Sequence, residues 1–170
     1  MFGLIMNKKN AGFTLVELLI VIIIIAILAG MALMNIGSAI SMAEATKIIN
    51  DVRMMHSALI SYYIDNDGLP PVASNGSVTP LSAQEVKSIS VYMDRNLDST
   101  RYDAVYLTRG PSASDSRILL GVRYLAGASA KLADVNKYLG RMAFGSGLCD
   151  PDGSIFQPTG TTDTVYIWLM

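Results

Sequence analysis

The stretch Gly12-Phe13-Thr14-Leu15-Val16-Glu17-Leu18-Leu19-Ile20-Val21, together with the apolar run that follows it, decides the fold of this chain. From Leu18 to Met34 no side chain carries a charge, an amide or a hydroxyl group. A helix of that length rises about 26 Å, close to the ~30 Å hydrocarbon core of a bilayer. The stretch therefore predicts a membrane-spanning helix. Glu17 lies near its start, where a carboxylate is costly in lipid unless it has a partner.

The basic residues near this run predict its orientation. Lys8 and Lys9 precede it, and the next Lys or Arg is Lys47. Positive charges stay on the cytoplasmic side of a membrane, so we expect the N-terminus inside and everything after about Ala43 outside.

The composition limits what the rest of the chain can be. A length of 170 residues suggests one globular domain plus the hydrophobic segment. The net charge is -1 and no basic block is present, so no nucleic-acid surface is evident. Cys149 is the only cysteine, which excludes an intramolecular disulfide and any site built from several cysteines.

The run from Lys8 to Val21 resembles the class III signal of type IV pilins and pseudopilins. This resemblance implies that a prepilin peptidase cuts between Gly12 and Phe13 and that the new N-terminal Phe13 is methylated. It divides the chain into a leader over residues 1–12, a transmembrane and filament-core helix over 13–43, and an extracytoplasmic head over 44–170.

Glu17 stands where that family has its glutamate. The resemblance implies that this carboxylate in an incoming subunit meets the Phe13 amine of the subunit already in place, which sets the register of assembly. A carboxylate in apolar surroundings needs such a cation to stay ionised. The alternative is a glutamate that caps the helix start, where the macrodipole favours a negative charge. Both roles are compatible.

Beyond the membrane the helical pattern continues. An apolar stripe recurs at steps of three and four residues through Ile48, Val52, Met55, Leu59 and Tyr62. The polar residues Glu44, Lys47, Asp51 and Ser61 lie off this stripe. The sequence Asp65-Asn66-Asp67-Gly68 then predicts the helix end at about Asp65.

The remaining sequence predicts an α+β head. We expect a short helix over 83–96 after the Ser82–Glu85 capping box, and strands over 104–108, 118–125 and 165–170. The first two of these strands are joined through a polar turn with Gly110-Pro111. A second helix starts at Ser129 and closes at Gly145. The predicted fold is thus a long N-terminal α-helix, transmembrane in its first half and amphipathic in its second, packed against a small antiparallel β-sheet.

Three smaller features have two interpretations each. Asp150 and Asp152, before Gly153, either form a plain turn or present oxygens to Ca²⁺, as in some pseudopilins; no other cofactor is expected. Asn75-Gly76-Ser77 is a turn or a glycosylation acceptor. His56 has no second ligand nearby, so we interpret it as a packing or solvated residue.

No catalytic constellation is present, and nothing argues for an enzyme. We expect a structural subunit that polymerises with copies of itself into a type IV pilus for adhesion, motility or DNA uptake. The expected partners are the prepilin peptidase, the inner-membrane assembly platform, minor pilins and, before assembly, membrane lipid. The precursor would cross the cytoplasmic membrane once and then join an extracellular pilus.

Two alternatives stay open. The first is a pseudopilin of a type II secretion or competence system, whose fibre is periplasmic. The second, from another class, is a signal-anchored periplasmic binding module that does not polymerise.

Overall fold

The computed structural model describes residues 12–73, 79–110, 117–125, 131–152 and 154–169. Contacts within the chain divide it into two units, Met1–Ile36 and Gly37–Met170. The predicted leader (except Gly12), Asn75-Gly76-Ser77, Pro111, Ser129, Gly153 and Met170 lie outside the described residues.

The first helix is α1, Leu15–Asn66, which confirms the expected long N-terminal helix. Its sequence contains no proline, and its only glycines, Gly30 and Gly37, are tolerated within it. The helix ends as predicted, to within one residue, because Asp67 adopts a left-handed backbone with φ of 50° and Gly68 and two prolines follow.

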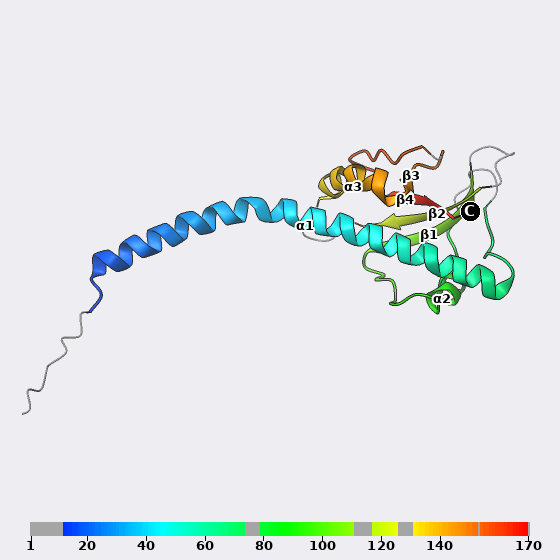
Figure 1. Cartoon of the computed structure of the whole chain (residues 1–170), viewed down its shortest axis with the longest axis horizontal. Helices are drawn as coiled ribbons and strands as arrows, with labels where there is room; N and C mark the ends of the chain where they lie inside the picture. Colours follow the sequence, from blue (N-terminus) through cyan, green and yellow to red (C-terminus); the bar gives the residue numbers. More distant parts are fainter. Residues whose placement is uncertain (1–11, 74–78, 111–116, 126–130, 153, 170) are drawn as a thin grey trace, which may run out of the picture. The chain divides into compact units, whose positions relative to one another are not determined.

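The second unit contains a four-stranded antiparallel sheet (Figure 1). The strands are β1 (Tyr102–Arg109), β2 (Ile118–Tyr124), β3 (Leu148–Cys149) and β4 (Thr164–Trp168), in the spatial order β1-β2-β4-β3. The three longer strands confirm the prediction from alternating and β-branched residues. Strand β3 was missed because two residues are too short to show any periodicity.

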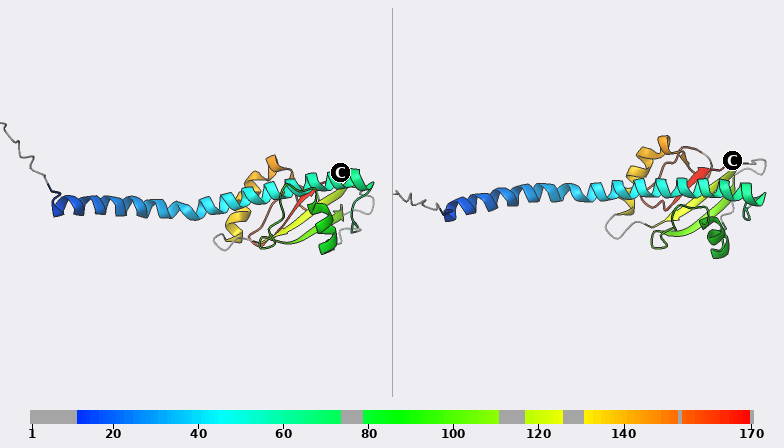
Figure 2. Two further views of the ribbon diagram at one scale, coloured as in Figure 1. Left: turned by 90° about the horizontal axis from the view of Figure 1, so that it is seen from below. Right: turned by 60° about the horizontal axis from the view of Figure 1, so that its bottom comes forward.

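One face of the sheet packs on the second half of α1 (Figure 2). Four members of the predicted stripe, Ile48, Val52, Met55 and Leu59, are buried, and Tyr62 packs at its edge. They meet sheet residues such as Leu120, Val122 and Val165, which are fully buried. The stripe therefore forms the core that joins the helix to the sheet, as its spacing predicts.

The two short helices differ from their predicted lengths. Helix α2 is Ala83–Ser90, with the expected Ser82–Glu85 capping box, and stops well before Asn96. Helix α3 is Leu132–Ser146, and it continues through Gly145. It ends where Gly147 takes a φ of 78°, a conformation that glycine adopts at no steric cost, so Gly147 rather than Gly145 is the terminating residue.

Candidate assembly site

The start of α1 is a capping box formed by Thr14 and Glu17. The Glu17 amide donates to Thr14 Oγ1 at 3.2 Å, which satisfies one of the free amides of the first turn. In return the Thr14 amide and hydroxyl donate to Glu17 Oε2 at 3.3 and 3.2 Å. Glu17 therefore does cap the helix, and its carboxylate is held at the helix end by local bonds.

Thr14 was not singled out from the sequence, although a signature was present. Thr14-Leu15-Val16-Glu17 is a Thr-x-x-Glu box directly before an apolar run, the usual sign of a helix N-terminus. Gly12 and Phe13 lie immediately before this box, and the Phe13 side chain is 82% exposed. The predicted cleavage bond is thus just outside the first helical turn. Cleavage and methylation there stay predictions.

The helix surface that follows the box is apolar on all sides. Every described side chain from residue 12 to 33 is exposed, and most of them are Leu, Ile, Val or Met. This part of α1 is long and apolar enough to cross a membrane, judged by length and composition. An apolar surface of this size is not stable in water, so lipid or other apolar helices must cover it.

The second half of α1 carries two buried carboxylates, contrary to the expectation that polar residues lie off the stripe. Glu44 accepts a hydrogen bond from Arg101, and Asp51 accepts bonds from Arg95 and from the Tyr102 hydroxyl, the latter at 2.5 Å. Both carboxylates lie in the interface between α1 and the segment 95–102. They tie that segment to the helix, because a buried carboxylate is tolerated only with charged or hydrogen-bonding partners.

The network shifts the ionisation of its basic and phenolic members. The hydrogen bond to Glu44 raises the pKa of Arg101 above its usual value. Burial, reinforced by the bond to Asp51, raises the pKa of the Tyr102 phenol well above 10. Both groups therefore keep their protons across the physiological range. The arrangement ties α1 to the segment 95–102.

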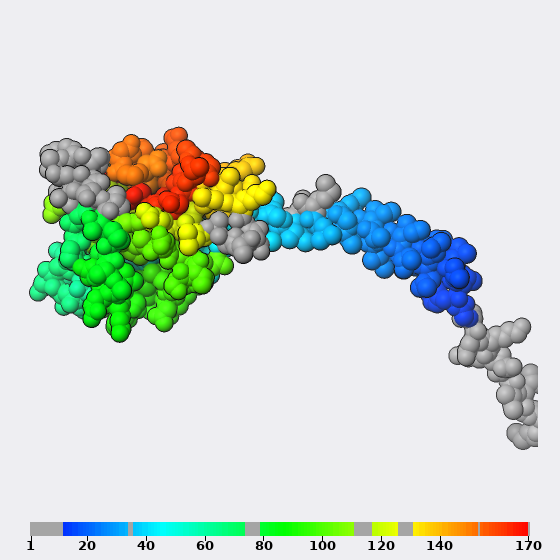
Figure 3. Space-filling model, turned by 180° about the vertical axis from the view of Figure 1, so that it is seen from behind, coloured from blue at the N-terminus to red at the C-terminus, as the bar shows by residue number. Residues whose placement is uncertain are grey.

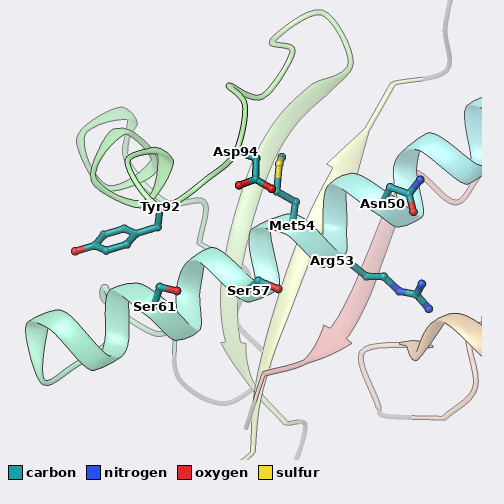
Figure 4. Close-up of a pocket in the computed structure, with 7 residues that line it drawn as sticks. All are labelled: Asn50, Arg53, Met54, Ser57, Ser61, Tyr92 and Asp94. Carbon is teal, nitrogen blue, oxygen red and sulfur yellow. The ribbon is translucent and has the colours of Figure 1, made fainter.

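A polar groove of about 320 Å³ lies on the outer face of α1 (Figure 4). It is lined from the helix by Asn50, Arg53, Met54, Ser57 and Ser61, and from the loop after α2 by Tyr92 and Asp94. In Figure 4 the Arg53 side chain points away from Asp94 and Tyr92.

The Asp150–Asp152 loop is organised by its own hydrogen bonds. Asp152 Oδ1 accepts from the Ser154 amide at 2.9 Å and hydroxyl at 2.7 Å, and Asp150 Oδ2 accepts from the Gln157 amide at 3.2 Å. These are the bonds of a turn. Among the described residues no three His, Cys, Asp or Glu side chains converge on one point. Calcium binding by Asp150 and Asp152 stays a prediction.

Cys149 and His56, the only cysteine and histidine of the sequence, differ in burial. Cys149 is buried in the sheet, and burial raises the pKa of its thiol to about 12, so it is a poor nucleophile at neutral pH. His56 is half-buried on α1.

Comparison with known proteins bears on the N-terminal segment. A family model described as the prokaryotic N-terminal methylation motif matches residues 7–33, a range that includes Gly12, Phe13 and Glu17. The chain is 37% identical over 64 residues to a protein of Klebsiella michiganensis described as type II secretion system core protein G, which covers 38% of this chain and 45% of the relative. It is 32% identical over 84 residues to the protein of that description in Escherichia coli K12, covering 45% and 58%. It is 33% identical over 63 residues to the protein of that description in Vibrio cholerae, and this match covers 37% of this chain and 43% of the relative.

This chain thus spans about half the length of the curated relatives it matches. The motif and the relatives confirm the resemblance to type IV pilin-like proteins, which the N-terminal residues predicted.

Proposed function

We propose that this pilin-like chain is a structural subunit of a type II secretion pseudopilus. The subunit enters the cytoplasmic membrane, is trimmed between Gly12 and Phe13, is methylated at Phe13 and polymerises through its apolar helix. Sequence reasoning favoured a surface pilus and kept the pseudopilin as the alternative. The description type II secretion system core protein G, shared by the relatives, favours the alternative.

The observation that carries this proposal is the uncovered apolar surface of α1, which directly follows the Thr14–Glu17 box. In a bilayer, lipid covers such a surface as well as another helix does. Association of helices therefore depends on close packing and on polar contacts between them. A polar contact at one end of the apolar surface would both strengthen the association and select one register.

Glu17 is placed to make that contact. The two hydrogen bonds that its carboxylate accepts in the box both go to Oε2, which leaves Oε1 available to a donor from another chain. Cleavage at Phe13 creates a positive amine of the required kind. When the Phe13 amine of one subunit pairs with Glu17 Oε1 of another, neither charge is left isolated in lipid. The Thr14–Glu17 box holds the carboxylate in position before this contact forms.

The remaining assignments follow from this mechanism. The partners are further copies of the chain, a prepilin peptidase and an inner-membrane assembly platform. The assembled fibre is periplasmic, and the head over residues 44–170 coats it. The role is structural, with no catalysed reaction.

The test compares Glu17→Gln with Thr14→Ala in the full chain, produced with its peptidase and platform. Both substitutions leave the apolar surface intact. Glu17→Gln removes the charge, so we expect cleaved and methylated subunit in the membrane and at least about tenfold fewer fibres, equivalent to about 1.4 kcal/mol. Thr14→Ala is the matched control, since it removes the cap, at a cost of about 1 kcal/mol, but keeps the carboxylate.

The readouts are the yield of fibres and the intact mass of the subunit in fibres and membranes. Normal fibres built from Glu17→Gln subunits would contradict the register contact. A wild-type chain that is never cut before Phe13, with the peptidase active, would contradict processing as a pilin-like subunit. Wild-type fibres that are long and released from the cell surface by shearing would favour the pilus instead.

A further inference from the structure

We propose that the heads of neighbouring copies join head to tail, with Phe144 of one copy inserted into an apolar groove between α2 and β1 of the next. The inference rests on the proposed function, because it describes how the heads contact one another in the fibre. It starts from an aromatic side chain and a hollow that occur on the same unit.

Phe144 stands almost free at the end of α3. Its side chain is 85% exposed, an unusual state for a phenylalanine in a folded domain. Lys137, Arg141 and Phe144 follow one another at four- and three-residue steps, which places them along one exposed face of the helix. Arg53 donates to the carbonyl of Gly145, the next residue, at 3.1 Å. Phe144 is therefore an apolar knob at the end of a helix face that carries Arg141, Lys137 and, farthest from it, Asp134, with Arg53 bound at the next residue.

The apolar groove lies on the opposite side of the head from Phe144. It has a volume of about 410 Å³, and its walls come from α2, from the loop after it and from β1. Most of its lining side chains are apolar, among them Leu81, Val86, Leu97 and Val105. A pocket of this size, mostly apolar with a few polar groups, is the kind of site that takes an aromatic group.

The border of the groove complements the border of the knob. Asp103 lines the groove, and its side chain is 55% exposed while it bonds to Arg123. Asp98 adjoins Ser99 of the lining, and its side chain is 44% exposed while it bonds to Arg101. Hydrogen bonds from Thr100 lower the pKa of Asp98, so it stays ionised. Both carboxylates stay about half exposed although each is paired with an arginine, so a cation beside Phe144 of another copy can approach them.

Knob and groove belong to opposite edges of the sheet. Strand β1 forms one edge and β3 the other, and α3 leads directly into β3. Leu81, beside the groove, donates its amide to Val105 of β1 at 2.8 Å. Figures 1 and 2 show α3 and α2 on opposite sides of the head, and the space-filling view agrees (Figure 3). Phe144 therefore cannot fill the groove of its own chain.

This geometry selects a second copy as the occupant. A contact that uses two different surfaces is heterologous, and each added copy leaves one free knob and one free groove. Such a contact continues without limit, as a fibre requires. A contact between two identical surfaces would stop at a dimer.

The test is a disulfide cross-link in the full chain with its peptidase and platform. The variant keeps Phe144 and carries Gly145→Cys, at an exposed position with open space around it, together with Ala83→Cys; the two single variants are the controls. All three variants also carry Cys149→Ala, because Cys149 lines another hollow together with Phe144 and the introduced cysteines must be the only thiols in the chain. After mild oxidation we expect a ladder of multimers from the double variant, and only monomers from each single variant.

A second measurement separates a structural effect from a contact. Phe144→Ala should reduce fibres about tenfold, equivalent to about 1.4 kcal/mol, because burial of an aromatic ring contributes at least that much. The cleaved subunit should stay at its normal level in the membrane. Val91→Ala, also an exposed apolar residue near α2 but outside the groove, is the control and should assemble normally.

The outcomes are distinct. Dimers from the Gly145→Cys single variant would overturn the inference in favour of a contact between two identical surfaces. A cross-link to a different protein would overturn the second copy as the occupant. Normal fibres from both Phe144→Ala and the double variant, without a ladder, would overturn the inference and leave the proposed function standing. Absence of fibres from the wild-type chain would instead defeat the proposed function itself.

Discussion

Replacing Asp51 by alanine should destabilise the head far more than an ordinary surface substitution on the same helix. Asp51 is only 3% exposed, and its two oxygens accept hydrogen bonds from Arg95 and from the Tyr102 hydroxyl. The substitution therefore removes both bonds and leaves the phenol, itself 7% exposed, without its carboxylate partner. Since Asp51 lies on the helix and the other two residues lie beyond α2, the loss affects a long-range connection.

The two bonds do not contribute equally. A hydrogen bond to a charged group contributes about 1.5–3 kcal/mol, more when the group left behind stays buried. The Arg95 side chain is 56% exposed, so water replaces Asp51 there and little is lost. We therefore expect Asp51→Ala to lower the free energy of unfolding by about 2–4 kcal/mol, below the 3–5 kcal/mol typical when a fully buried ion is left unpaired.

The assay is equilibrium unfolding of the full chain in detergent, followed by the fluorescence of Trp168, the only tryptophan, which lies in β4. The control is Asn50→Ala, the exposed neighbour of Asp51 on α1, with an expected effect within about 0.5 kcal/mol. Tyr102→Phe should cost about 1.5–3 kcal/mol, and the double substitution clearly less than the sum. An Asp51→Ala effect equal to that of Asn50→Ala, or strict additivity with Tyr102→Phe, would refute the reasoning.

Two further predictions concern the sheet. Gly121→Ala should lower the free energy of unfolding by about 1–3 kcal/mol, because the added Cβ would lie 2.5 Å from Cε1 of Tyr166. The control is Gly145→Ala in α3, which has open space around it and should stabilise that helix slightly. Denaturant titration of both variants measures the two effects. The buried thiol of Cys149 has a pKa raised to about 12 from 9, so its contribution to stability should be complete below pH 9 and be lost as the pH rises towards 12; a Cys149→Ala variant should show a flatter decline of melting temperature over that range, and an identical decline would contradict the shift.

Features set by neighbouring residues were predictable from the sequence. The apolar run after Glu17 can be recognised without any tertiary partner. The spacing of the stripe from Ile48 to Leu59 predicts which face of the helix is buried. The Ser82–Glu85 box was identified for the same reason. The Thr14–Glu17 box has the same local form, a Thr-x-x-Glu signature directly before an apolar run.

Features that depend on distant residues were not predictable. In the sequence, Glu44 and Asp51 were placed off the apolar stripe of the helix. Both are nevertheless buried, and they pair with Arg101 and Arg95, which lie 57 and 44 residues away in the sequence. Likewise the Tyr166 ring, which approaches Gly121 from the neighbouring strand and leads us to expect that Gly121→Ala is destabilising, could not be predicted from the residues around position 121.

The sequence by itself thus determined the long apolar helix, its capped start with Glu17 and the faces of the main elements, because helix and strand periods and capping act over a few residues. Only the tertiary structure decided which charges are buried and paired, and that Phe144 and the α2–β1 groove lie at opposite edges of one sheet. Those facts depend on the order β1-β2-β4-β3, which is set by the packing of strands far apart in the chain.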